Sequence, residues 1–164
     1  AAAPSACRLQ PHAQAQLLEA LQYALDAANT DADFHVAALL LHGVRPFQTA
    51  EGPEQCGHSN GILETIRDHP LFLGMYFWET YFLVSLTQDP GNTTQAQWQA
   101  AVEVGQTMAQ NAAVSPAPMA GGKLDEFLAL LHELGIDERI GRQLRGRVRE
   151  MFALQPQTGG SPGS

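Results

Sequence analysis

The stretch from His69 to Leu86 constrains the fold more than any other part of the chain, because it is the densest in large apolar side chains. Six of the twelve aromatic residues fall within positions 72–82. Pro70 suits the first turn of a helix, and Asp89–Gly91 is a strong stop signal. A helix that is apolar on almost every face is a buried helix. The sequence therefore predicts a central buried helix over about 70–88.

A membrane-spanning helix is the alternative for this stretch, since a bilayer core is crossed by about 20 apolar residues. Glu79 stands at its middle, and Thr80 and Ser85 are polar. Charged residues, including Arg67 and Asp89, flank the stretch on both sides. We therefore favour a buried core helix over a membrane span.

Helical periodicity continues on both sides of the central helix. Leu17, Leu21 and Leu25, for example, follow one another at intervals of four and so form one apolar stripe. Further helices are predicted over residues 11–28, 31–43, 60–68, 95–113, 123–134 and 138–154. Together they predict a single all-α domain, residues 11–154, built as a bundle of six or seven helices around the central helix. Residues 1–10 are expected to be a flexible lead, and the Gly-, Pro- and Ser-rich residues 155–164 a disordered tail.

Glycine and proline mark two loops, Arg45–His58 and Val114–Gly122. The helix over 95–113 carries small residues such as Gly105 on its apolar stripe, which permit close approach of a neighbouring helix. The residues expected to cap helix ends are Ser59, Thr93 or Thr94, Gly135 and Asp137.

Composition and charge narrow the classes of function. Apolar residues make up 45% and charged residues 16% of the 164, as in globular proteins. The net charge is -8, and the first 138 residues hold sixteen acidic residues against four basic ones. Such acidity argues against nucleic-acid binding, which depends on neutralising phosphates. No signal peptide is visible at the start, since residues 1–10 lack its basic and apolar regions. The expected localisation is cytoplasmic.

No cofactor, metal site or catalytic group is apparent from the residue pattern. Cys7 and Cys56 are too few for a disulfide framework. Two free thiols are expected, and one bridge between them is the alternative. Cys56 and His58 would make only half of a zinc site, and no second ligand pair has a matching spacing. The glycines do not follow a phosphate-binding pattern, and no nucleophile stands beside a base. His35 and His42 are seven residues apart on one helix face, yet without a third ligand they predict surface or core histidines.

Clustered arginines are the chemical feature that stands out. Five of the nine basic residues lie in eleven positions, namely Arg139, Arg142, Arg145, Arg147 and Arg149. One interpretation is a solvated helix face whose charges pair with Asp137, Glu138 and Glu150. The other is a binding surface for an anionic partner: an acidic protein, a phosphorylated segment or an anionic membrane. Arg142, Arg145 and Arg149 are spaced by three and four and are expected to form a basic stripe opposite the apolar side.

Three sets of residues resemble parts of known helical domains. The pattern Pro70-Leu71-Phe72, Phe77-Trp78 and Phe82 resembles a helical domain of set-binding-factor-like proteins. The segment from Leu124 to Arg149 resembles the helix, turn and basic helix of MAP-kinase-activating death-domain proteins, which belong to the DENN family of Rab exchange factors. Leu40 to Arg45 is similar to an early block of RUN domains. These resemblances imply a cytosolic helical module that serves small-GTPase and vesicle-traffic proteins, and they imply no active site.

The sequence thus predicts a non-catalytic protein-interaction module, an adaptor domain in small-GTPase-linked vesicle trafficking or cytoskeletal regulation. The expected partner is a protein with an acidic surface, bound by the arginines of residues 139–149. Two alternatives remain open. One is a membrane-surface or phosphate-binding domain that uses the same arginine helix, and the other is an enzyme whose site is not visible in sequence.

Overall fold

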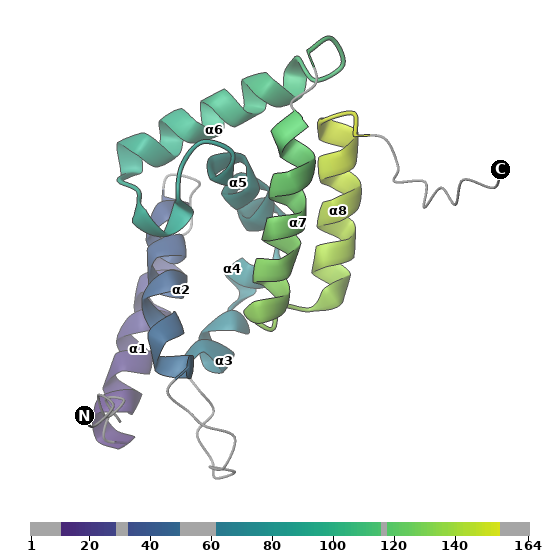
Figure 1. Ribbon diagram of the computed structural model, residues 1–164. Helices are drawn as coiled ribbons and strands as arrows, with labels where there is room; N and C mark the ends of the chain where they lie inside the picture. The colour runs from purple at the N-terminus through teal and green to yellow at the C-terminus, as the bar shows by residue number, and fades with distance from the viewer. Residues whose placement is uncertain (1–10, 29–32, 50–61, 116–117, 155–164) are drawn as a thin grey trace, which may run out of the picture.

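The computed structural model describes residues 11–28, 33–49, 62–115 and 118–154. They form eight α-helices and one short 3₁₀ helix, with no strand, so the all-α prediction is confirmed. The elements are α1 (Pro11–Ala27), α2 (Phe34–Thr49), α3 (Ile62–Arg67), α4 (Pro70–Leu73), α5 (Met75–Ser85), the 3₁₀ helix η2 (Pro90–Asn92), α6 (Gln95–Gln110), α7 (Pro118–Glu133) and α8 (Glu138–Met151). In Figure 1, α7 and α8 lie side by side, α1 packs along α2, and α6 crosses one end of the bundle above α5.

The predicted central helix is present but is not continuous. It divides into α4 and α5 at Gly74, whose backbone is extended with φ -88° and ψ 140°. Trp78 Nε1 donates a hydrogen bond to the carbonyl oxygen of Phe72 at 2.8 Å, so the indole satisfies a backbone group that the break leaves without a helical partner. The division adds one helix, which is part of why eight are found where six or seven were expected.

The length of α5 also bears on the membrane-spanning alternative. After the break at Gly74, α5 keeps 11 residues. In the described ranges no helix is both long and apolar enough to cross a membrane.

The core is built around the aromatic side chains of α5. Trp78 and Phe82 are fully buried, and Phe77 and Tyr81 are nearly so. Phe127 of α7 joins them, with its ring centroid 5.4 Å from that of Tyr81 and 5.7 Å from that of Phe82. The prediction of a buried helix at the centre is therefore confirmed for α5.

Helix α6 packs closely on α5, as the small residues of its stripe predicted. A Cβ atom added at Gly105 would lie 2.9 Å from the Cβ and 3.0 Å from the carbonyl oxygen of Leu83. The start of α6 is fixed by a capping box in which Thr94 and Gln97 each accept the other's backbone N–H.

Two predicted boundaries are wrong. Helix α2 does not stop at Gly43 but continues through Arg45 to Thr49, because a helix interior tolerates a single glycine at a modest cost. Helix α7 begins at Pro118, inside the predicted loop 114–122, where a proline in the first helical turn loses no hydrogen bond. The rest of the predicted loop 45–58, together with Ser59, lies outside the described residues.

The turn that leads into α8 follows the sequence prediction. Gly135 has φ +70° and ends α7 in the left-handed conformation, with Ile136 N–H bonded to the Leu131 carbonyl oxygen at 3.0 Å. Asp137 then caps α8 by accepting the Arg139 N–H at 2.8 Å. These two caps fix the direction in which α8 runs back along α7.

Candidate functional site

Helix α8 presents an apolar side to the core and arginines to the outside. Ile140, Leu144 and Val148 are buried at intervals of four residues. Arg142 and Arg145 are exposed, and Arg149 is partly buried. The predicted amphipathic pattern is therefore present, with charge and apolar surface segregated on one helix.

Two of the five predicted site arginines are engaged within the protein. Arg139 Nη2 lies 3.6 Å from Asp137 Oδ2, the side chain that caps the same helix. Arg147 forms a salt bridge with Glu79 of α5, including an Nη2–Oε2 distance of 3.4 Å. Arg147 is three residues after Leu144, so it lies beside the buried side of α8 and reaches the neighbouring helix.

The other three, Arg142, Arg145 and Arg149, have no acidic partner among the residues that the structure describes. We call them the arginine face. Glu138 and Glu150 are exposed on the same helix, but neither forms a salt bridge with these arginines. On a purely solvated helix face, arginines pair with carboxylates of the same helix or its cap. Among the described residues such a pair is found at Arg139 and not at these three arginines.

A shallow groove of about 200 Å³ adjoins the arginine face between α7 and α8. Its apolar lining comes from Leu128, Leu131 and Ile136, and Arg142 and Arg145 stand on its α8 side. His132, Asp137 and Glu138 line the groove as well, so its small apolar surface is bordered by carboxylates and by two guanidinium groups.

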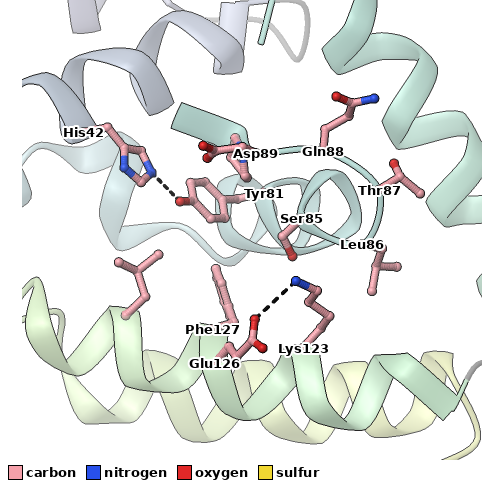
Figure 2. Close-up of a pocket in the computed structure, with 12 residues that line it drawn as sticks. His42, Tyr81, Ser85, Leu86, Thr87, Gln88, Asp89, Lys123, Glu126 and Phe127 are labelled. Atoms are coloured by element: carbon pink, nitrogen blue, oxygen red, sulfur yellow. Dashed lines mark hydrogen bonds and ion pairs between the residues drawn. The ribbon is translucent and has the colours of Figure 1, made fainter. Parts of the chain in front are cut away.

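A larger cavity of about 600 Å³ opens elsewhere, between α2, α5, η2 and α7 (Figure 2). His42 of α2 and Tyr81 of α5 meet in its wall, with His42 Nε2 2.5 Å from Tyr81 Oη. On the α7 side, Lys123 Nζ pairs with Glu126 Oε2 at 3.2 Å. Sequence reasoning missed this cavity because its residues come from four elements, and only the seven-residue spacing of His35 and His42 pointed towards one of them.

The predicted half of a metal site cannot be placed, because Cys56 and His58 lie outside the described residues, as does Cys7. In the parts of the chain that the structure describes, no three His, Cys, Asp or Glu side chains cluster as metal ligands would.

Comparison with known proteins adds no assignment. The chain matches no protein-family model, no curated protein sequence and no solved structure. The resemblances to set-binding-factor-like, DENN-family and RUN domains therefore rest on the sequence patterns alone, and function has to be argued from the surfaces of this fold.

Proposed function

We propose that the protein is a non-catalytic interaction module that binds an acidic segment of a partner protein through the arginine face of α8. The observation that carries this proposal is that Arg142, Arg145 and Arg149 have no acidic partner in the described part of a protein of net charge -8. Acidic residues are abundant enough to have paired with them. A second molecule that supplies the carboxylates is the arrangement that this charge distribution favours.

The chemistry of arginine and the shape of the groove define the partner further. A guanidinium group binds a carboxylate through two parallel hydrogen bonds, which gives geometric selectivity as well as affinity. The groove beside Arg142 and Arg145 offers apolar contact from Leu128, Leu131 and Ile136. The matching ligand is a peptide in which an aliphatic or aromatic residue is followed or preceded by acidic residues.

The sequence patterns support a cellular setting for this module. Its resemblance to helical domains of Rab exchange factors and to RUN domains supports a role in the cytoplasm, in vesicle trafficking or cytoskeletal regulation. The partner would then be a small GTPase or a protein that acts with one. Purified small GTPases, loaded with GDP or with a GTP analogue, are the direct binding partners with which to test this part.

The test of the arginine face is a peptide selection with matched variants. Peptides are selected from a random phage-displayed library on the wild-type protein, and their Kd is measured by fluorescence polarisation. One variant carries Arg142→Gln, Arg145→Gln and Arg149→Gln. The control carries Gln95→Glu, Gln99→Glu and Gln106→Glu on the exposed side of α6, which lowers the net charge by the same amount.

We expect the selected peptides to combine acidic residues with a large apolar residue. The arginine variant should weaken binding at least about tenfold, which is about 1.4 kcal/mol, whereas the α6 control should change it little. Binding should also weaken as salt rises. Equal loss in both variants would mean a general charge effect. Binding of phosphatidylserine vesicles by the wild type, lost in the arginine variant and unaccompanied by peptide binding, would instead identify a membrane-surface domain.

A further inference from the structure

The cavity between α2, α5, η2 and α7 has the size and lining of a small-molecule site. Its volume of about 600 Å³ lies within the range of roughly 300–1,000 Å³ that ligand pockets occupy. Apolar surface comes from Leu86, Phe127 and Leu130, and polar groups converge on it from α2, α5, η2 and α7. No residue of α8 lines it, so it is separate from the arginine face.

One wall of the cavity is held rigidly. The His42 ring lies parallel to that of Tyr81, with an interplanar angle of 9°, and its Nε2 is hydrogen-bonded to Tyr81 Oη. The backbone of η2 presses on the same ring, because a Cβ atom added at Gly91 would come within 2.7 to 2.9 Å of three atoms of the imidazole. Packing from both sides fixes the wall before any ligand arrives, which lowers the entropic cost of binding.

Two opposite charges stand at different sides of the cavity. Asp89, at the start of η2, uses one carboxylate oxygen to accept the Gly91 N–H at 3.0 Å. Lys123, on α7, extends its ammonium group toward the middle of the opening, where it pairs with the exposed Glu126, which also lines the cavity (Figure 2). Between them, the Ser85 hydroxyl donates to the Phe82 carbonyl oxygen at 2.6 Å and keeps lone pairs to accept another hydrogen bond.

From this arrangement we infer that the cavity binds a small zwitterion of the α-amino-acid type with an apolar side chain. The ammonium group of the ligand would pair with Asp89, and its carboxylate with Lys123. Its side chain would lie against Phe127 and Leu130. A ligand with only one of the two charges would form only one of these two ion pairs, and the site would hold it less tightly.

The experiment compares ligands that differ only in charge. Binding of L-phenylalanine, 2-phenylethylamine and 3-phenylpropanoate to the full chain is measured by isothermal titration calorimetry, and L-leucine serves as a smaller zwitterion. We expect L-phenylalanine to bind about tenfold tighter than either of its singly charged analogues, a difference of about 1.4 kcal/mol. Lack of binding by all four at about 10 mM, or equal binding of zwitterion and analogues, would overturn the inference.

Two variants test whether Lys123 binds the carboxylate of the ligand and Asp89 its ammonium group. Lys123→Met should reduce the affinity for the amino acid to that of the amine, while it leaves binding of the amine unchanged. Asp89→Asn should reduce the affinity for the amino acid to that for the carboxylate analogue, 3-phenylpropanoate. The asparagine oxygen can still cap η2. Glu103→Gln, exposed on α6, is the control and should have no effect. If either cavity variant retains wild-type preference for the zwitterion, the proposed pairing is wrong. Neither variant touches α8, so these results do not depend on the arginine face.

Discussion

Arg147 of α8 and Glu79 of α5, which are 68 residues apart in sequence, form a salt bridge between the two helices. The Glu79 side chain is only 14% exposed, whereas that of Arg147 is 59% exposed. The arginine thus covers the one carboxylate in the middle of the most apolar stretch of the chain. This contact explains why an acidic residue is tolerated there, and it separates Arg147 from the arginine face.

The energetic coupling of this pair is the first prediction. In a double-mutant cycle of Glu79→Gln and Arg147→Gln, we expect a coupling of about 1 kcal/mol, the upper end for a pair that solvent reaches. Urea unfolding of the four proteins measures it. Arg145→Gln replaces Arg147→Gln as the control and should show no coupling to Glu79. A coupling within error of zero would mean that the pair does not stabilise the fold.

The second prediction concerns Trp78, which is fully buried and hydrogen-bonded to the Phe72 carbonyl oxygen. Trp78→Ala should lower the free energy of unfolding by about 3–5 kcal/mol, since it opens a cavity and leaves that carbonyl unsatisfied. Tyr23→Ala, at a residue that is 77% exposed, should cost less than about 0.5 kcal/mol. A loss below about 1 kcal/mol for Trp78→Ala, measured by chemical denaturation, would contradict the buried position of α5.

A pair of glycine substitutions tests the contact between α5 and α6. Gly105→Ala places a methyl group against the backbone of Leu83 and should destabilise the protein by about 1–3 kcal/mol, although alanine favours helix. Gly146→Ala on α8 meets no atom within 4 Å and should stabilise by about 0.5–1 kcal/mol. Thermal unfolding of both variants gives the comparison. Stabilisation by Gly105→Ala would show that the helices are not in close contact.

The fourth prediction is that the purified protein carries no stoichiometric metal and gains no thermal stability with nucleotides. The sequence shows no set of three or four metal ligands at a matching spacing and no glycine-rich phosphate loop. Elemental analysis and a thermal-shift assay test both parts. One zinc per chain would refute the first part, and Cys56 and His58 would then be the first ligands to replace.

Local pattern was sufficient for much of the fold. Buried positions of α8 follow from the four-residue spacing of Ile140, Leu144 and Val148, and its boundaries follow from Gly135 and Asp137. Each of these signals acts within one or two helical turns, so it can be recognised without knowledge of the tertiary contacts. The break at Gly74 could not be predicted in this way, because Trp78 stabilises it by a hydrogen bond that also requires the indole to be buried.

The same distinction between local pattern and tertiary contact applies to the two candidate sites. By itself the sequence determined that the chain is helical, that α5 is buried and that α8 carries a basic stripe, because periodicity along one helix decides which side chains share a face. Only the tertiary structure decided that Arg147 forms a salt bridge with Glu79 and that Arg142 and Arg145 adjoin an apolar groove. It also decided which side chains surround the larger cavity, among them His42, Tyr81, Asp89 and Lys123. Those residues lie on different helices, and the packing of whole helices against one another, which no local pattern encodes, brings them together.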